Sequence, residues 1–230
     1  MRRYLILKLD GPMQAWGGHT FEDYRPSHPF PTRSGLLGLI GACLGLERRD
    51  SNSLETLANS VRFTVRRDPS VTRQQADADG DRSVVCKPAI KLRDFHTVLE
   101  ARRVDGKPGK NPIVSQREYL HDAVFSVAVG GTVGAAFSLD AIAAALHRPR
   151  YTPFLGRRSC PIANPLFYSW VESAADGRAA LHEIPPGAGP IYSEEEELRS
   201  QHRQLIRDVP QYGERRQFDT RQIFMLPEEE

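Results

Sequence analysis

The order of its apolar segments is the sequence feature that most constrains the fold of this chain. Four short runs rich in strand formers and two longer segments with helical spacing can be distinguished. In chain order they are 4–9, 35–46, 61–66, 123–129, 138–147 and 166–171. The order strand, helix, strand, strand, helix, strand predicts an α+β fold with a ferredoxin-like (RRM-like) βαββαβ core.

The helix expected at 35–46 carries an unusual number of glycines. Pro31, Thr32, Arg33 and Ser34 precede it and form a helix-start signal. Glycines then recur every three or four residues on one face, at Gly35, Gly38, Gly41 and Gly45. Because glycine lowers helix propensity, we expect another part of the backbone to approach this face closely.

The strand expected at 61–66 alternates between apolar and polar residues, which is typical of a half-buried strand. We expect the apolar side chains to face the core; they are Val61, Phe63 and Val65. We expect the polar side chains to face solvent; they are Arg62, Thr64 and Arg66.

The whole chain, 1–230, is expected to form a single domain with two additions to its core. Residues 69–122 are polar, then basic and broken by Pro and Gly, so we interpret them as an inserted β-hairpin thumb. Residues 172–230 form an irregular β-containing C-terminal extension, with possible strands at 201–209 and 221–226. Periodicity does not predict how this extension packs.

Composition excludes several classes of protein. The three cysteines, Cys43, Cys86 and Cys160, are widely spaced and odd in number, which argues against a disulfide framework or a zinc ribbon. The histidines lack metal-site spacing, and no GxSxG or paired-carboxylate motif is present. We therefore predict no metal, no cofactor and no catalytic residue. The first apolar run is too short for a signal peptide or a membrane span, so we expect a soluble cytoplasmic protein without membrane contact.

Charge distribution is more informative than net charge, since 31 basic residues nearly balance 29 acidic ones. The segment 148–161 contains four arginines, a glycine and no acid, which suits contacts to phosphate. Arg33 and Ser34, at a helix start, could bind an anion or simply cap the helix. The alternative for the 148–161 segment is a solvated loop whose arginines pair with surface carboxylates.

The predicted thumb is also basic. Residues 87–117 contain eight Lys and Arg side chains against three acids, and a projecting basic hairpin can reach a nucleic-acid backbone. Phe95 and His96, beside Arg93, could stack on an unstacked base. Phe95 could equally anchor the hairpin to the core.

Four motifs together resemble the CasD family of the RAMP superfamily. They are GPMQAWG at 11–17, FPTRSGLLGLIGACLGL at 30–46, LRDFHTVLEAR at 92–102 and YTPFLGRRSCPIANPL at 151–166. Members of this family are the subunits of type I-E CRISPR Cascade complexes that hold the 5′ handle of the guide RNA (crRNA). The segments QQADADGD and RRVDGKPGKNPIVSQ and the terminal PEEE do not follow the family pattern.

The resemblance implies a set of RNA-binding residues and partners. The residues, together with neighbouring basic side chains, are Gln14, Trp16, Arg33, Ser34, Lys91, Arg93, His96, Arg117, Arg150, Tyr151, Gly156, Arg157 and Arg158. The implied partners are the crRNA 5′ handle, the backbone subunit CasC, the large subunit CasA and, through the complex, target DNA. The resemblance implies a non-catalytic subunit that holds the handle and caps the backbone subunits in antiviral defence.

Two other functions remain open at this stage. RAMP relatives in other CRISPR subtypes cleave repeat RNA without metal, and Tyr119, Lys91, His96 and His121 could supply the groups for such an endoribonuclease. A purely structural interaction protein without RNA contact is the third alternative, although it would leave the basic thumb and loop unexplained.

Overall fold

The computed structural model describes residues 1–18, 20, 23–69, 90–101, 106, 107, 109, 111–185, 189–195, 202–213 and 217–226. The polar start of the predicted insertion, Cys86 and the terminal acidic run lie outside these ranges. None of the helices in these ranges combines the length and the apolar character that a membrane span requires.

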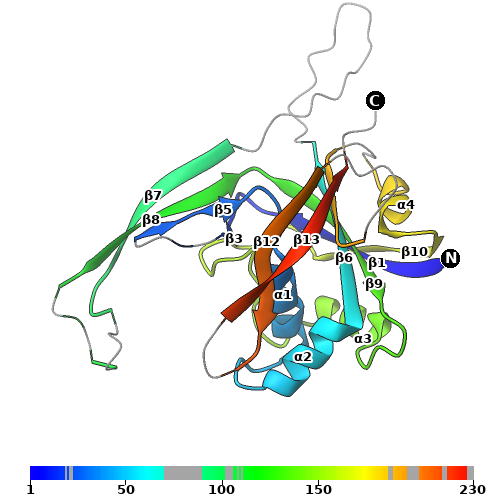
Figure 1. Ribbon diagram of the computed structural model, residues 1–230, viewed down its shortest axis with the longest axis horizontal. Coiled ribbons are helices and arrows are strands. Elements are labelled where there is room, and N and C mark those ends of the chain that lie inside the picture. Colours follow the sequence, from blue (N-terminus) through cyan, green and yellow to red (C-terminus); the bar gives the residue numbers. More distant parts are fainter. Residues whose placement is uncertain are drawn as a thin grey trace, which may run out of the picture.

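Four antiparallel strands form the centre of the fold (Figure 1). They are β1 (Arg2–Asp10), β6 (Val61–Asp68), β9 (Val124–Gly131) and β10 (Phe167–Ala174). Their spatial order is β10-β1-β9-β6, so the first and third of these strands lie in the middle. Leu5 pairs with Val129, and Val65 pairs with Val127, which places apolar side chains from three strands together. The four strands predicted from periodicity are therefore present.

The two predicted helices are present as α1 (Arg33–Leu44) and α3 (Leu139–His147), and both cover one face of this sheet. Leu36, Leu37 and Ile40 of α1 are buried in one cluster with Leu5 and Val127 of the sheet. The side chain of Thr32 caps α1 by accepting a hydrogen bond from Gly35 N at 3.3 Å. Gly45 ends the helix in the left-handed conformation, with φ of 79°.

The opposite face of the sheet is covered by α4 (Gly177–His182) and the chain after it. The expectation that Thr64 and Arg66 face solvent is therefore wrong, since both are buried, whereas Arg62 is exposed. Arg66 donates hydrogen bonds to the carbonyls of Leu181 (2.5 Å) and Ile184 (2.9 Å). An alternating pattern identifies the strand but does not show whether a second layer covers its polar side.

Helix α2 (Ser51–Ser60) was not predicted. It begins at Asp50, whose carboxylate accepts a hydrogen bond from Ser53 N at 3.1 Å, and it buries Leu57 against the core. The Asp50 cap was the available signal for this helix.

A long β-hairpin lies in the predicted insertion. Its strands are β7 (Ile90–Val98) and β8 (Ile113–His121), and it extends away from the central sheet (Figure 1). The long first loop supplies β2 (Met13–Gln14) and β4 (Tyr24–Arg25), which pair with β8 at the base of the hairpin. The remaining short strands of that loop, β3 (Trp16–Gly17) and β5 (Ser27–His28), pair with each other.

The C-terminal extension is more regular than its sequence indicates. Strands β12 (His202–Gln211) and β13 (Gln217–Leu226) form a hairpin close to the two predicted strands. The short strand β11 (Ile191–Ser193) joins this hairpin to β6, so the sheet grows to seven strands. The hairpin thereby reaches α1, next to which the candidate site lies.

Candidate nucleic-acid interface

The loop 149–166, between α3 and β10, holds the glycine-containing motif predicted to bind phosphate. Gly156 has φ of 85°, and a Cβ there would lie 1.8 Å from the carbonyl oxygen of Ala15. The close backbone approach is therefore made by the first loop, which is fixed by the bond from Ala15 N to Leu155 O at 3.1 Å. Gly156 is needed for this internal contact.

Arg157 belongs to the same internal junction. Its guanidinium donates to the carbonyls of Glu118 (3.1 Å) and Arg25 (3.0 Å), and it lies over the ring of Tyr119 at 4.8 Å. Arg157 thus joins the loop to the hairpin, and it is only partly exposed. Arg158, by contrast, is exposed, which makes it the better candidate for binding phosphate.

Three further residues of the predicted set are buried inside the protein. Gln14 and Trp16 have no exposed surface; Gln14 accepts a bond from Trp16 Nε1 at 3.0 Å and donates to the Leu9 carbonyl at 3.1 Å. Arg33 is 7% exposed, and its guanidinium binds Glu194 at 2.6 Å. These contacts take Gln14, Trp16 and Arg33 out of the candidate surface, because their polar atoms already have partners.

Arg33 is part of a buried ionic cluster that holds the C-terminal hairpin on α1. Asp208 accepts a bond from Arg33 N at 2.7 Å and binds Arg221 through both carboxylate oxygens, at 2.6 and 2.8 Å. Burial by itself would lower the pKa of Arg221, but the hydrogen bonds that it donates to Asp208 and the charge of Glu194 raise it above its ordinary value. The cluster fixes the end of β12 beside the start of α1.

Glu118 organises the base of the β7–β8 hairpin. It accepts bonds from Tyr24 Oη (2.5 Å) and Ser27 N (3.0 Å), and Lys91 Nζ lies 3.3 Å away. Burial raises the pKa of Glu118, but these hydrogen bonds and the charge of Lys91 outweigh it, so the pKa lies below its ordinary value. Arg93 is two-thirds exposed and reaches Glu118 only at 3.7 Å, so most of its guanidinium faces solvent.

The opposite face of the hairpin carries a different cluster. His96 Nε2 lies 2.8 Å from Tyr119 Oη and 3.1 Å from Asp94, and Arg117 donates to Ser115 Oγ at 3.1 Å.

Phe95 is 69% exposed, so the alternative in which it anchors the hairpin to the core does not hold. Other apolar side chains of the hairpin are also exposed, namely Ile90, Leu92, Val98, Leu99, Ile113 and Val114.

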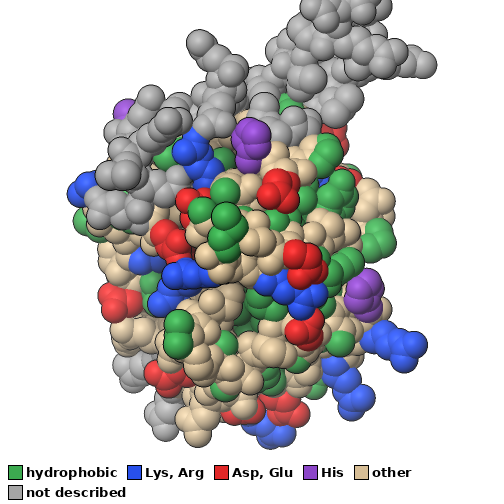
Figure 2. Space-filling model, turned by 90° about the vertical axis from the view of Figure 1, so that its right-hand side faces the viewer, with side chains coloured by type: hydrophobic (Ala, Val, Ile, Leu, Met, Phe, Trp, Pro, Cys, Tyr) green, Lys and Arg blue, Asp and Glu red, His purple; other side chains and the backbone are tan. Residues whose placement is uncertain are grey.

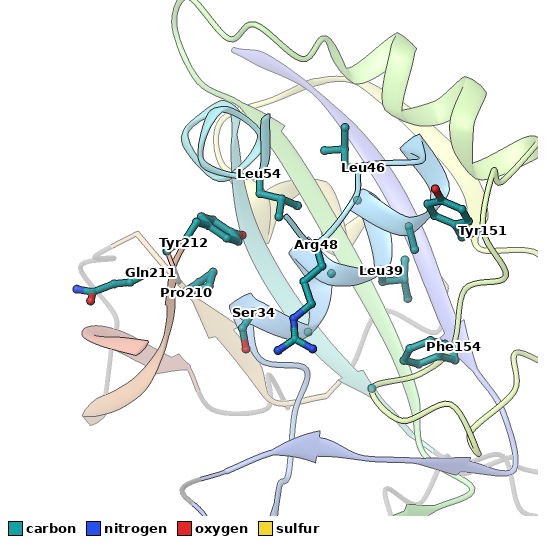
Figure 3. A pocket seen from close by; sticks show the side chains of 16 residues that line it. Ser34, Leu39, Leu46, Arg48, Leu54, Tyr151, Phe154, Pro210, Gln211 and Tyr212 are labelled. Atoms are coloured by element: carbon teal, nitrogen blue, oxygen red, sulfur yellow. The ribbon is translucent and has the colours of Figure 1, made fainter. Parts of the chain in front are cut away.

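A cavity of about 450 Å³ lies beside α1 (Figure 3). Ser34 and Gly38 of α1 line one part of it, and Tyr151, Phe154 and Gly156 come from the loop. The end of the C-terminal hairpin closes it with Pro210, Gln211, Tyr212 and Gly213. The ionic cluster around Asp208 therefore holds one wall of the cavity in place.

Arg48 also lines this cavity and was missing from the predicted residues. It follows α1 in a short turn whose sequence, LERRD, carries no motif. Within the described ranges, the guanidinium groups of Arg48, Arg150 and Arg158 form no ion pair or hydrogen bond. Arg150 packs over Gly45 at the end of α1, and Arg150 and Tyr151 are both exposed.

Several cations away from the cavity are paired with acids. On the face shown in Figure 2, basic and acidic side chains are interspersed over much of the surface. Arg3 binds Asp140 (2.8 Å) and Glu172 (3.1 Å), and Lys8 binds Asp68 at 2.5 Å. The side of the molecule that carries the cavity is therefore the better candidate for binding a polyanion.

Metal-ligating side chains do not cluster in the described part of the chain, where no group of three or more His, Cys, Asp or Glu could hold an ion. Cys43 and Cys160 are free and buried. Burial raises the pKa of the Cys43 thiol to about 11, so it stays protonated at neutral pH.

Comparison with known proteins identifies the family. The model of the CRISPR-associated protein family (Cas_Cas5) matches residues 4–224, and the chain therefore belongs to this family. It is 46% identical over 227 residues to the CRISPR system Cascade subunit CasD of Escherichia coli (strain K12), covering 98% of this chain and 96% of that protein.

Two solved structures are similar over almost the whole chain. A chain of a CRISPR RNA-guided surveillance complex superimposes with a TM-score of 0.72 at 31% identity, covering 98% of this chain and 90% of that one. The crystal structure of a Cas protein has a TM-score of 0.61 at 25% identity, with 98% of both chains covered.

Proposed function

We propose that this chain is a non-catalytic subunit of a Cascade surveillance complex and holds the 5′ handle of the crRNA. The observation that carries the proposal is a set of three arginines, Arg48, Arg150 and Arg158, whose guanidinium groups have no partner within the described ranges. Arg48 lines the cavity beside α1 together with the exposed rings of Tyr151 and Phe154. Charge-assisted contacts to phosphate supply affinity, and aromatic rings accept unstacked bases. The similarity to a Cascade subunit supports the same role.

The architecture fits this role. We propose that β1, α1, β6, β9, α3 and β10 form a ferredoxin-like core, supported by the strand order β10-β1-β9-β6. We further propose that the β7–β8 hairpin is a thumb whose exposed Arg93 and Phe95 contribute to RNA binding. In the complex, the chain would cap the CasC backbone and contact CasA, and it would meet target DNA only indirectly.

The geometry of the hairpin disfavours the endoribonuclease alternative. Tyr119 and His96 share one face, since they are bonded to each other and Tyr119 stands opposite Leu92. Lys91 pairs with Leu120, so it lies on the other face and binds Glu118. His121 pairs with Ile90 and so lies on the same face as Tyr119. Lys91 is therefore separated from the other three groups, and the four do not converge on one position where a reacting phosphate could lie.

The test is filter binding of crRNA by the full chain across a salt series. Arg150→Ala with Arg158→Ala removes two exposed cations. Arg2→Ala with Arg62→Ala is the charge-matched control, because these exposed arginines line a different hollow that shares no residue with the cavity. Loss of two phosphate contacts should reduce the magnitude of the salt slope by about 1.4. The control should keep the wild-type slope. Equal slopes in both folded double variants would refute the assignment of this surface.

A further inference from the structure

Gly38 has no structural explanation within the fold. It lies in the interior of α1, where glycine is unfavourable, yet a Cβ at this position would meet no protein atom within 4 Å. Gly35 on the same face does have such an explanation, because a Cβ there would lie 2.8 Å from the ring of Trp16. The close approach expected along this glycine face is therefore absent at Gly38, which instead borders the cavity.

Aromatic rings from separate segments flank the same space. Tyr151 is 45% and Phe154 37% exposed, and both belong to the loop before β10. Tyr212 lies on the other side of the cavity (Figure 3). The volume, about 450 Å³, falls within the range of roughly 300–1,000 Å³ typical of small-ligand sites. A flat, partly apolar ligand suits these walls.

A cation completes the site. The Arg48 side chain extends along the cavity toward Ser34 (Figure 3). Its neighbour Arg49 is neutralised by Glu47 at 2.6 Å, whereas Arg48 has no carboxylate partner in the described part of the chain. An unpaired guanidinium beside aromatic walls matches a ligand that joins a flat ring to an anionic group.

We propose that this cavity binds one unstacked base of the RNA, over Gly38, and that Arg48 contacts the phosphate adjoining that base. The proposal rests on the proposed function, because the crRNA handle supplies the ligand. A base in a duplex is covered on both sides, so only a single-stranded nucleotide can enter. The site would fix the register of the handle, while the exposed loop arginines supply general affinity.

The experiment is an abasic scan of the handle against the full chain. Each RNA lacks one base but keeps every phosphate, and its affinity is measured for wild type, Gly38→Leu, Arg48→Ala and the control Arg49→Ala. Wild type should lose about fivefold or more in affinity at one handle position, the lower end of what a stacked base contributes. Gly38→Leu places a side chain in the space over position 38 where the base would lie, so the variant should bind intact RNA more weakly and be insensitive to that abasic position.

Arg48→Ala should reduce the magnitude of the salt slope by about 0.7, and Arg49→Ala should leave it unchanged. A thermal melt checks the fold of each variant. If Gly38→Leu does not fold, Tyr151→Ala replaces it, because this exposed ring is removed without touching the core.

The outcomes separate the two proposals. If no form of the chain binds crRNA, the proposed function is refuted. If RNA binds but folded Gly38→Leu keeps wild-type affinity, or shows the same abasic penalty as wild type, the base site alone is overturned. A Gly38→Leu variant that binds RNA normally but no longer assembles with other subunits also overturns it, because a protein segment would then occupy the cavity.

Discussion

Removing the Asp208 carboxylate should destabilise the protein far more than its place on a peripheral strand suggests. Asp208 is 2% exposed and binds Arg33 N and the guanidinium of Arg221, which is itself largely buried. Asp208→Ala leaves the Arg221 charge without its closest counter-ion. Breaking one side of a buried pair costs about 3–5 kcal/mol.

This loss is a large part of the roughly 5–15 kcal/mol by which domains are stable. With a urea m-value near 3 kcal/mol/M, the unfolding midpoint should fall by roughly 1–1.7 M. The matched control is Asp219→Ala, because Asp219 is an exposed acid on the neighbouring strand β13. The control should stay within about 0.5 kcal/mol of wild type.

A second variant tests the physical reason for the effect. Asp208→Leu with Arg221→Met leaves no unpaired charge at this pair, so it should be less destabilised than Asp208→Leu alone. If Asp208→Ala changes the free energy of unfolding by less than about 1 kcal/mol, the ionic cluster does not hold the hairpin on α1. The cavity wall at 210–213 would then need another explanation.

Three further perturbations have defined outcomes. Arg157→Ala should lower the free energy of unfolding in urea by about 1.5–3 kcal/mol, because two charge-assisted hydrogen bonds are lost. Replacement of the exposed Arg158 by Ala should change it by less than about 0.5 kcal/mol. Equal effects of the two variants would contradict the structural role of Arg157. Gly156→Ala should lower the free energy of unfolding, followed in a thermal melt, by at least about 1–2 kcal/mol, because φ is 85° and the Ala15 carbonyl blocks the new methyl group. An unchanged melting temperature would argue against this geometry. The pKa of Glu118 is lowered in the folded state, so its contribution to stability is present above the unfolded pKa of about 4.3 and is lost as pH falls through the folded value. In urea melts between pH 7 and pH 3, the free energy of unfolding should therefore fall more steeply for wild type than for Glu118→Gln. Parallel curves would exclude this linkage.

Local sequence signals predicted the central elements of the fold well. The helix-start signal at Thr32 gives the observed cap of α1, and alternation located β6 within two residues. These features depend on neighbours in the chain, so periodicity and cap chemistry identify them. The burial of Arg66 depends on α4, more than a hundred residues away in sequence, and no local pattern reports that contact.

The candidate site shows the same division. The motif at 148–161, which was predicted to contact phosphate, lies in the loop that borders the cavity, and Tyr151 and Gly156 line it. Composition could not separate Arg157 from Arg158, because their difference lies in two carbonyls supplied by Glu118 and Arg25. Arg48 was missed because its position beside the cavity arises from the path of the chain after α1.

Arginine therefore has two distinct uses in this protein, and a count of basic residues merges them. Arg33, Arg66 and Arg221 are buried and neutralised, so they stabilise the positions of the C-terminal hairpin and α4. Arg150 and Arg158 are exposed and unpaired within the described ranges, so their charge can act on a ligand. Replacing Arg33 or Arg221 disturbs the cluster that holds a wall of the cavity, whereas replacing Arg150 or Arg158 leaves the walls in place and removes a contact. A loss of RNA binding identifies a contact residue only if the free energy of unfolding is unchanged. When a buried arginine is replaced, RNA affinity and the free energy of unfolding should fall together.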